Sequence, residues 1–328
     1  MTHSLRFIAL FAFLVILPAA QAENQTLKAL GLPQDSRVLL IHADDVGMSW
    51  AAEDGSLQAM EKGWVTCGSA MVPCSWFPAT VKHCAENPKL DMGLHLTLTS
   101  EWSVYRWGPV AGRSVVPGLV DDEGYLWRNV MQVYQGVGGA TAEIEKELQA
   151  QIDLSRKQKL EPTHMDSHMG TLYYNGIYFK IACNLALKND IPFMVFKYNP
   201  KMQGVHPALG YYTQEVADEL EKAGFPLLDL LIQEEHVGET YEEGFQNYSK
   251  VISELPVGVT LMILHLGVDS PEFQHVTGRY LARDQQYRIF TDPKMKEHLE
   301  KEKITLIGWR ELKEAIWDKR DKSIERVF

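Results

Sequence analysis

The sequence is short of cysteine and of basic charge, and beyond its first residues it has no long apolar run. Four cysteines in 328 residues are too few for a fold built on disulfides, and none form a Cys-x-x-Cys pair that would support a thiolate zinc site. Lys and Arg number 32 against 43 Asp and Glu, a formal net charge of −11, which argues against the basic face of a nucleic-acid-binding protein. After residue 22 no apolar segment approaches the ~20 residues that cross a bilayer.

Aromatic and aliphatic residues are plentiful. Hydrophobic residues make up 45% of the chain, and 12 Phe, 13 Tyr and 8 Trp argue against a disordered protein. A chain of this length can bury the core of one large α/β domain of about 250–300 residues or of two smaller domains. No internal repeat, low-complexity tract or linker divides it. We therefore predict a single domain over residues 23–328.

The first 22 residues have the pattern of a secretory signal peptide. Arg6 precedes an apolar run over residues 7–17, Pro18 ends the run, and residues 20–22 have the small-x-small sequence that precedes a cleavage site. The run is too short to span a bilayer. We predict cleavage after Ala22 and export to the periplasm or the medium, with an uncleaved anchor as the alternative. Export permits disulfides, and the sequence leaves open the pairing of Cys67, Cys74, Cys84 and Cys183.

Short apolar runs alternate along the chain with amphipathic, charge-rich stretches. Runs of this kind predict buried strands, and apolar residues spaced three or four apart predict helices. The predicted strands include 38–41, 64–72, 92–98, 192–196, 259–264 and 304–307. The predicted helices include 50–62, 142–159, 178–188 and 293–301. About seven strand–helix units favour an α/β fold with one (β/α)-barrel-like domain, distorted or incomplete.

Residues 101–139 differ from the rest of the chain. They show little periodicity and contain many glycines. They also hold a concentration of aromatic residues: Trp102, Tyr105, Trp107, Trp127 and Tyr134. We predict that this segment is a long, aromatic-rich insertion in the barrel. Aromatic faces can stack on sugar rings, although packing in the core or the loop is the better explanation for any one of these residues.

Histidine and aspartate lie at the ends of the predicted strands. Asp44 and Asp45 follow the first strand, His95 lies in a later one, and His168 and His265 follow two more. Alone, the aspartates are explained by a helix cap and each histidine by a satisfied core position. In parallel β/α folds, however, the carboxyl ends of strands meet at one edge of the barrel. Two histidines and one aspartate there form a metal site with open positions, and the second aspartate and the further histidine supply a base and an acid.

At these residues the chain resembles the YdjC/ChbG-type carbohydrate deacetylases, which have a β/α barrel related to that of polysaccharide deacetylases. The matching pieces are 43–47, 65–66, 93–99, 162–168 and 264–265, in the family's order. The resemblance implies removal of the acetyl group from N-acetylated sugars, such as chitooligosaccharides, with a divalent metal. The chain departs from the family in having Met169 to Leu172 where further histidines often follow, and Leu261 and Leu266 in the late strand. Because of these departures, the family's specificity for chitooligosaccharides does not carry over directly to this chain.

Carried over residue by residue, the resemblance makes Asp45, His95 and His168 the metal ligands. Asp44 then becomes the general base and His265 the general acid. The metal is one divalent ion: histidine ligands favour zinc, while the family is also associated with magnesium.

Other residues are expected to support this site. Asp166 is placed to receive a ring N–H and fix the tautomer of a ligating histidine, and His164 either orients a ligand or points away. Weaker candidates for substrate contact are His42, Trp76, Trp102, Tyr173 and Arg279. Arg283 and Asp284 either contact substrate or form a solvated face.

Two other functions fit the same residues. One is a metal-dependent hydrolase of another amide or of an ester, and the other is a secreted carbohydrate-binding protein on the same scaffold. A binding protein needs no base beside a metal, so the retention of both Asp44 and Asp45 favours an enzyme. The expected partner is an N-acetylated sugar or oligosaccharide, with no nucleic acid and no membrane after signal cleavage. Monomer and homodimer are both left open.

Overall fold

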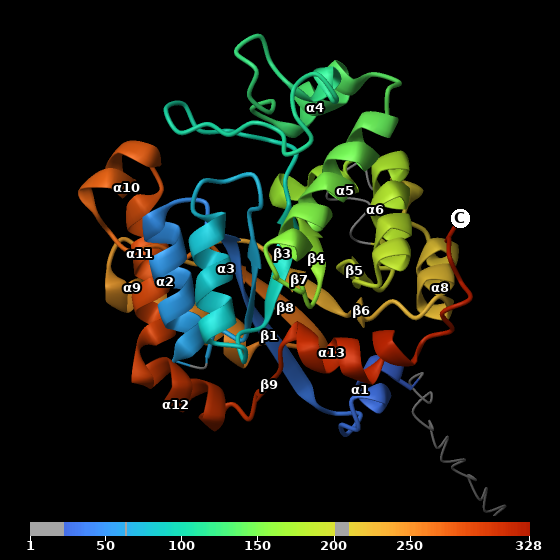
Figure 1. Cartoon of the computed structure of the whole chain (residues 1–328). Helices are drawn as coiled ribbons and strands as arrows, with labels where there is room; N and C mark the ends of the chain where they lie inside the picture. Colours follow the sequence, from blue (N-terminus) through green and yellow to red (C-terminus); the bar gives the residue numbers. More distant parts are fainter. Residues whose placement is uncertain (1–22, 63, 201–209) are drawn as a thin grey trace, which may run out of the picture.

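Strands and helices alternate along the chain as predicted, and the strands form a curled parallel sheet inside a layer of helices (Figure 1). The computed structural model describes residues 23–62, 64–200 and 210–328, so the predicted signal peptide and its cleavage site lie outside the described residues. The strands of the larger sheet are β1 (Arg37–Val46), β2 (Cys67–Ala70), β3 (Met92–Leu96), β4 (Met165–Ser167), β7 (Leu230–Ile232), β8 (Gly258–Leu264) and β9 (Thr305–Leu306). A smaller sheet pairs β5 (Val195–Phe196) with β6 (Leu227–Leu228).

The strand order explains the curled shape. The larger sheet runs β4-β3-β2-β1-β8-β7, with β9 also paired to β1, and each of these pairings is parallel. An isolated parallel bridge between Met165 and Phe193 leads from β4 toward the smaller sheet. Asp229 alone separates β6 from β7 in the sequence. The arrangement confirms the predicted distorted (β/α)-barrel-like α/β fold.

The helices surround the sheet. They are α1 (Gln25–Ala29), α2 (Trp50–Glu61), α3 (Phe77–Glu86), α4 (Val130–Val137), α5 (Ala142–Lys157), α6 (Gly176–Asn189), α8 (Gln214–Lys222), α9 (Tyr241–Ser253), α10 (Pro271–Val276), α11 (Tyr280–Thr291), α12 (Pro293–Lys301) and α13 (Trp309–Ala315). Short 3₁₀ turns are η1 (Pro117–Leu119), η2 (His168–Tyr173) and η4 (Trp317–Lys319).

The four helices predicted from periodicity are confirmed as α2, α5, α6 and α12. Several helices begin at a side chain that accepts a backbone N–H of the first turn, such as Ser49 for α2, Asn175 for α6 and Thr240 for α9. Such caps fix where each helix starts and therefore where the preceding strand-end loop lies. Within the described residues, no helix combines the length and apolar character that a membrane crossing requires.

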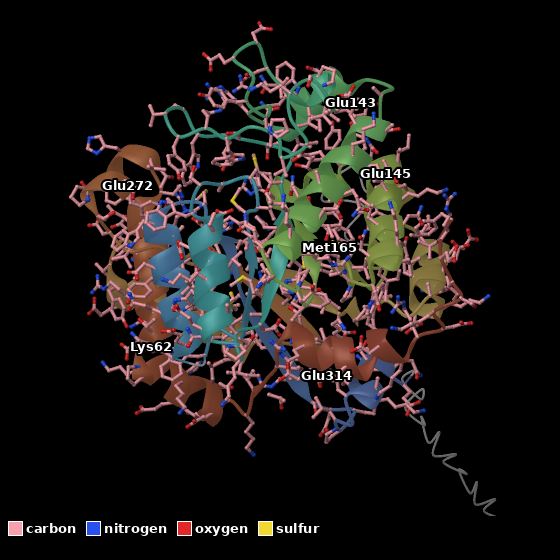
Figure 2. All side chains as sticks on the ribbon, viewed as in Figure 1. Lys62, Glu143, Glu145, Met165, Glu272 and Glu314 are labelled. Atoms are coloured by element: carbon pink, nitrogen blue, oxygen red, sulfur yellow. The ribbon has the colours of Figure 1, made fainter. Side chains whose placement is uncertain are left out.

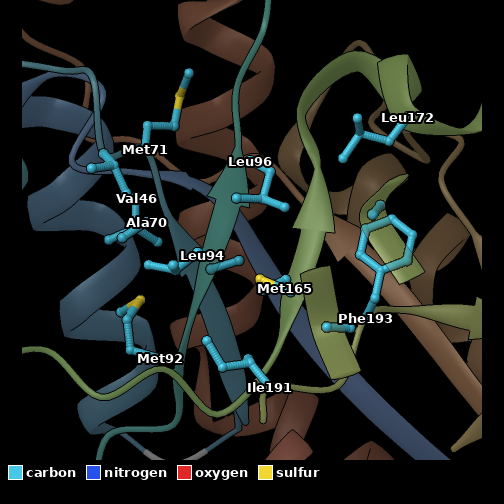
Figure 3. Close-up of a cluster of buried hydrophobic side chains, with 14 of the residues drawn as sticks. Val46, Ala70, Met71, Met92, Leu94, Leu96, Met165, Leu172, Ile191 and Phe193 are labelled. Atoms are coloured by element: carbon cyan, nitrogen blue, oxygen red, sulfur yellow. The ribbon is translucent and has the colours of Figure 1, made fainter. Parts of the chain in front are cut away.

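Alternation along each strand separates two apolar regions. On β1, Leu39, Ile41 and Ala43 belong to the large cluster formed with the helices, whereas Val38 and Leu40 belong to a second cluster. Figure 3 shows the first region around β3, with Leu94, Leu96 and Met165 pointing to one side of the sheet. The second cluster brings together strand side chains and α13: Val38, Leu40, Cys67, Leu228, Val259, Leu261, Trp309 and Leu312.

The barrel interior changes from apolar to polar along the strands. On β1, Val38 and Leu40 are followed on the same face by His42 and then Asp44, all buried. The same positions on the neighbouring strands carry Ser69 and His95, also buried. The apolar half stabilises the fold, at about 1.5–3 kcal/mol for each large side chain fully buried. The polar half contains the groups that sequence analysis singled out.

The predicted insertion lies between β3 and α5 and covers the upper end of the sheet in Figure 1. The Trp107 indole N–H donates to the carbonyl of Thr99 at 2.8 Å. The carboxylate of Glu147 on α5 accepts the backbone N–H groups of Val110 and Ala111 at 2.9 and 2.8 Å. Figure 2 shows Glu143 on α5 beside the insertion, where it accepts the Gly118 N–H at 2.7 Å. The insertion is thus tied to the barrel at several points.

All four cysteines are free and buried. Burial raises the pKa of each thiol, to about 12 for Cys84 and well above the ordinary value for Cys67, Cys74 and Cys183. Thiols of this kind are unreactive packing groups, and none contributes to the site described below.

Candidate active site

A bulge at the end of β1 turns two consecutive carboxylates toward the same space. Ala43 pairs with Gly68, and Val46 pairs with Ala70. Strand β1 therefore advances three residues where β2 advances two, so β1 contains one extra residue. Asp45 has φ +61°, in the left-handed region that a non-glycine residue rarely adopts. In a regular strand Asp44 and Asp45 would face opposite sides of the sheet. Strain of this kind is typical of functional sites.

Asp45, His95 and His168 converge on one point inside the barrel, and all three are buried. His95 comes from β3 and His168 follows β4. Asp45 Oδ1 lies 3.5 Å from His95 Nε2 and 3.3 Å from His168 Nδ1, and the two ring nitrogens are 3.2 Å apart. We call these three residues the triad. The structure therefore brings together the three ligands that the resemblance implies.

Each histidine of the triad has its other ring nitrogen on a carboxylate. His95 Nδ1 lies 2.7 Å from Asp166 Oδ1, and the Ser69 hydroxyl donates to Asp166 Oδ2 at 2.8 Å. His168 Nε2 lies 3.0 Å from Glu101 Oε2. A ring N–H donated to each carboxylate leaves His95 Nε2 and His168 Nδ1 as the nitrogens that face Asp45. The contact predicted for Asp166 is present.

Arg283 on α11 holds Asp45, the third member of the triad. Its Nη2 donates to Asp45 Oδ2 at 2.7 Å, and its guanidinium carbon lies 5.7 Å from the centre of the Trp102 ring. Burial by itself raises the pKa of Asp45, but Arg283 and His168 outweigh it and hold that pKa well below the ordinary range. Asp45 is therefore a carboxylate with one oxygen committed to Arg283 and the other facing the two histidines.

The carboxylates around the triad also determine its proton content. Burial by itself lowers the pKa of His168, but Glu101 and Asp45 face the ring and raise the pKa to about 10. Burial likewise opposes protonation of His95, yet Asp166 and Asp44 raise its pKa. These carboxylates therefore favour positive charge between the ligand atoms of the triad.

Whether the triad fits a divalent metal can be judged from Asp45 Oδ1. Among the described residues this buried atom has no hydrogen-bond partner, which is costly for a carboxylate oxygen. It faces two imidazole nitrogens across 3.3 and 3.5 Å, close to the spacing of neighbouring ligands at about 2.0–2.1 Å from a zinc-like ion. An N,N,O donor set also leaves coordination positions for water and substrate. The residues fit such an ion.

Asp44 and His265 lie beside the triad. Asp44 Oδ2 is 3.8 Å from His95 Nε2 and 4.0 Å from His265 Nε2, and Asp44 Oδ1 lies 2.8 Å from His42 Nδ1. His265 comes directly after β8, and its side chain is partly exposed. The two predicted proton-transfer groups are thus next to each other, at the exposed side of the triad.

Two residues predicted to contact substrate make contacts inside the protein. His42 is completely buried between Asp44 and His164, so it cannot line the substrate site. The Tyr173 hydroxyl donates to the Met194 carbonyl at 2.7 Å and its ring stacks on Phe193, so it is a packing residue. In both cases the sequence showed a polar or aromatic group near a strand end but not which way its side chain points.

The remaining predicted residues are placed as follows. Trp102 lies over Arg283, and Trp76 lies half-buried at the start of α3. Arg279 is largely exposed and forms an ion pair with Glu235. His164 bonds to His42 and reaches the triad only through other residues.

Sequence reasoning missed Glu101 and Ser69 and left Arg283 undecided. Glu101 opens the insertion, and Ser69 lies on β2 in the same interior row as His95. Arg283 reaches Asp45 from a helix 238 residues away in the sequence. Period-two spacing on β2 could have indicated Ser69, but no local signal pairs Glu101 or Arg283 with the triad.

Comparison with known proteins gives consistent matches over most of the chain. Residues 38–301 match the model of a family described as YdjC-like protein. A carbohydrate deacetylase of Thermus thermophilus is 29% identical over 299 residues, covering 89% of this chain and 99% of that protein. A carbohydrate deacetylase of Brevibacillus brevis is 28% identical over 281 residues, covering 84% and 99%.

A solved structure shares the fold. It comes from Enterococcus faecalis V583 and carries a provisional description as a cellobiose-phosphate cleavage protein. It superposes with a TM-score of 0.69 at 24% identity, over 84% of this chain and 99% of that one. At this level of identity the likeness concerns the fold alone.

Proposed function

This chain belongs to the YdjC-like protein family, and from that premise we propose that it is a metal-dependent carbohydrate N-deacetylase. Its substrates would be N-acetylated amino sugars or their oligosaccharides, cleaved to acetate and the free amine. The names of the two bacterial relatives, which this chain matches over almost their full length, support the reaction class. The observation that carries the proposal is the triad with a second carboxylate, Asp44, beside it.

Hydrolysis of an amide needs a polarised carbonyl and an activated water. A divalent metal held by Asp45, His95 and His168 supplies the Lewis-acid chemistry. Asp44 Oδ2 faces the same space and accepts the proton of the attacking water as general base. His265, 4.0 Å from Asp44 Oδ2, donates a proton to the departing amine of the sugar.

The surrounding residues orient these groups. Asp166, Ser69 and Glu101 fix the ring nitrogens of the two ligating histidines. Arg283 fixes Asp45 and has Nε and Nη1 without hydrogen-bond partners among the described residues. Trp102, which lies over the same guanidinium, supplies an aromatic face for a sugar ring.

The proposal is tested by acetate release. Metal-stripped protein is reloaded with one divalent ion at a time and assayed on a panel of N-acetylated mono- and oligosaccharides, with O-acetyl esters alongside. We expect activity that requires the ion and is lost in His95→Ala, while His275→Ala, which removes an exposed histidine on α10, retains it. Sugar binding without acetate release would favour a binding protein, and release from esters alone would favour an esterase.

The division of roles between the two aspartates is tested by conservative variants. Asp45→Asn should lose the metal, since it removes a ligand charge, and lose activity with it. Asp44→Asn should retain the metal and lose kcat by about 10²–10⁴-fold, the usual contribution of a general base. Metal content and kcat are measured on the same samples. The opposite pattern would exchange the two roles.

We also propose that the protein is exported. The support is the signal-like pattern of residues 1–22. N-terminal sequencing of protein recovered outside the cytoplasm should begin at Glu23. A product that retains residues 1–22 in a membrane fraction would indicate the uncleaved anchor.

A further inference from the structure

A chain of buried polar side chains leads from Asp44 away from the triad. His42 Nδ1 lies 2.8 Å from Asp44 Oδ1, and His42 Nε2 lies 2.8 Å from His164 Nε2. His164 Nδ1 lies 3.1 Å from the Thr163 hydroxyl, which in turn bonds to Asp91 Oδ1. We call His42, His164, Thr163 and Asp91 the buried relay. All four are at most 8% exposed, and none is a member of the triad.

The relay crosses the barrel interior from one end of the strands to the other. Asp44 belongs to the carboxyl end of β1, whereas Asp91 immediately precedes β3. Asp91 Oδ2 accepts the backbone N–H of Arg310 on α13 at 2.7 Å. In Figure 1 α13 lies at the end of the sheet opposite the insertion. The far end of the relay is therefore at the opposite end of the strands from Asp44.

The surrounding chain makes room for the relay. A Cβ on Gly93 would lie 2.4 Å from the His164 ring, and one on Gly308 would lie 2.3 Å from Asp91 Oδ2. The Trp309 ring stacks on His164 with centroids 4.8 Å apart. Two glycines and a tryptophan thus fix the position of His164 and Asp91. Replacing either glycine by alanine would force these groups to move.

A metal is a poorer explanation of this cluster. His42, His164 and Asp166 have ligand atoms within reach of one another. However, the two Nε2 atoms are only 2.8 Å apart, a hydrogen-bond distance, whereas two ligand nitrogens at about 2.0–2.1 Å from a tetrahedral ion lie further apart. One Nε2 therefore carries a proton and the other accepts it.

Hydrogen-bond counting restricts the relay to two directions. If His42 Nδ1–H donates to Asp44 and the ring is neutral, His42 Nε2 must accept from His164 Nε2–H. His164 Nδ1 must then accept from Thr163, whose own oxygen accepts from a protonated Asp91. In the reverse direction Thr163 donates to an Asp91 carboxylate. His42 then has to be a cation, or Asp44 has to carry a proton.

Burial favours the first direction, because His42, His164 and Asp91 are at most 5% exposed and an additional buried charge would be costly. Burial and the neighbouring His42 lower the pKa of His164 well below its ordinary value, so this ring is neutral. Burial raises the pKa of Asp91, which favours the protonated acid that donates to Thr163 in this direction. A proton on Asp91 and two neutral imidazoles satisfy every link and leave the Asp44 carboxylate as the only charge along this chain.

We propose that the buried relay positions Asp44: its hydrogen bonds all point toward this residue, so that His42 Nδ1–H holds Oδ1 and Oδ2 is left facing the triad. The proposal rests on the proposed function only in taking Asp44 as the base. None of the four residues belongs to the triad. His42 contacts Asp44 directly, and its Nε2 also lies 3.5 Å from Asp166 Oδ2, so the four act as positioning residues. The proton at Asp91 fixes the tautomer of His42 across the width of the barrel.

The direct test is nitrogen NMR of the full chain with ¹⁵N-labelled histidine, loaded with zinc. The two ring signals are identified by their loss in His42→Gln and His164→Gln. We expect two neutral rings, His42 protonated on Nδ1 and His164 on Nε2. A wild-type protein with His42 protonated on Nε2 alone, or with His164 protonated on Nδ1, would overturn the proposal. This readout requires no enzymatic activity, so it stands even if no sugar in the panel is deacetylated.

A matched pair of variants tests the consequence for catalysis. Thr163→Val keeps the shape of the side chain but removes the link, whereas Thr163→Ser keeps the hydroxyl. We expect Thr163→Val to mix the tautomers of His164 and His42 and to lower kcat at least tenfold, with KM and zinc affinity changed less than twofold. Thr163→Ser should behave as the wild type. A folded Thr163→Val protein with wild-type tautomers and kcat would contradict the relay.

Discussion

At the scale of single residues, the chemistry of the site depends on which ring nitrogen of each histidine is free. His95 and His168 offer different atoms to the triad, Nε2 and Nδ1, because their partners Asp166 and Glu101 lie on different sides. The sequence indicated Asp166 because it lies two residues before His168, next to a predicted strand end. It did not indicate Glu101, whose carboxylate meets His168 only after the insertion folds back over the barrel.

Loss of the Asp166 carboxylate should weaken metal binding without removing a ligand. In Asp166→Asn the His95 Nδ1–H loses a charged acceptor, and outer partners of this kind contribute about 10–100-fold to metal affinity. Zinc affinity measured by titration calorimetry should fall within that range, and Asp35→Asn, an exposed aspartate before β1, should leave it unchanged. Equal affinities for the wild type and Asp166→Asn would show that the Asp166 carboxylate does not support the metal site.

Glu53 on α2 gives a pH-dependent contribution to stability. Burial raises the pKa of this carboxyl to about 7, with Asp54 adding to the shift, and Oε2 has no hydrogen-bond partner among the described residues. The folded state therefore binds more protons than the unfolded state between pH ~4.5 and ~7, and stability falls as pH rises through this window.

Replacement of Glu53 should remove this loss of stability at higher pH. Glu53→Gln should be about 1–2 kcal/mol more stable relative to the wild type at pH 8 than at pH 5, after allowance for solvent screening. Urea unfolding at the two pH values measures the difference. Glu86→Gln on α3, which is exposed, is the control and should show no such change. A Glu53→Gln advantage that is the same at both pH values would mean that this carboxyl is not perturbed.

At the scale of elements, the helices and strands followed from periodicity, but the geometry of the site did not. Apolar runs predicted β1, β3 and β8, and spacing of three and four predicted α2, α5, α6 and α12. Strict alternation, however, would place Asp44 and Asp45 on opposite faces. The bulge that brings them together depends on how β1 pairs with β2, and this pairing cannot be predicted from the sequence of one strand. Arg283 was undecided for the same reason, since its role follows from the packing of α11 on the barrel.

The insertion should depend on its attachment to α5. Glu147 accepts two backbone N–H groups of the insertion and the side-chain amide of Gln151, at 2.8–2.9 Å. Glu147→Ala leaves these donors unpaired, at a cost of about 2 kcal/mol or more. We expect a lower urea midpoint and faster proteolytic cleavage within residues 101–139. Glu145→Ala, two residues away on the exposed face of the same helix, is the control; equal cleavage rates for the two variants would contradict the attachment.

At the scale of the whole molecule, the barrel separates stability from chemistry. One end of the interior is filled by apolar side chains from β1, β8 and α13, and the other end holds the triad and Asp44. The order of the motifs along the chain was sufficient to predict a (β/α)-barrel-like fold. It was not sufficient to predict the buried relay, because His42 and His164 are 122 residues apart and become neighbours only when β1 and β4 face each other across the interior.

The central claim is that Asp45, His95 and His168 bind one divalent ion with Asp44 beside it. The most direct measurement is an anomalous-scattering map from a crystal of the zinc-loaded protein. The account predicts one strong peak within bonding distance of Asp45 Oδ1, His95 Nε2 and His168 Nδ1. A peak between His42, His164 and Asp166, or no peak near the triad in a crystal of catalytically active protein, would contradict it.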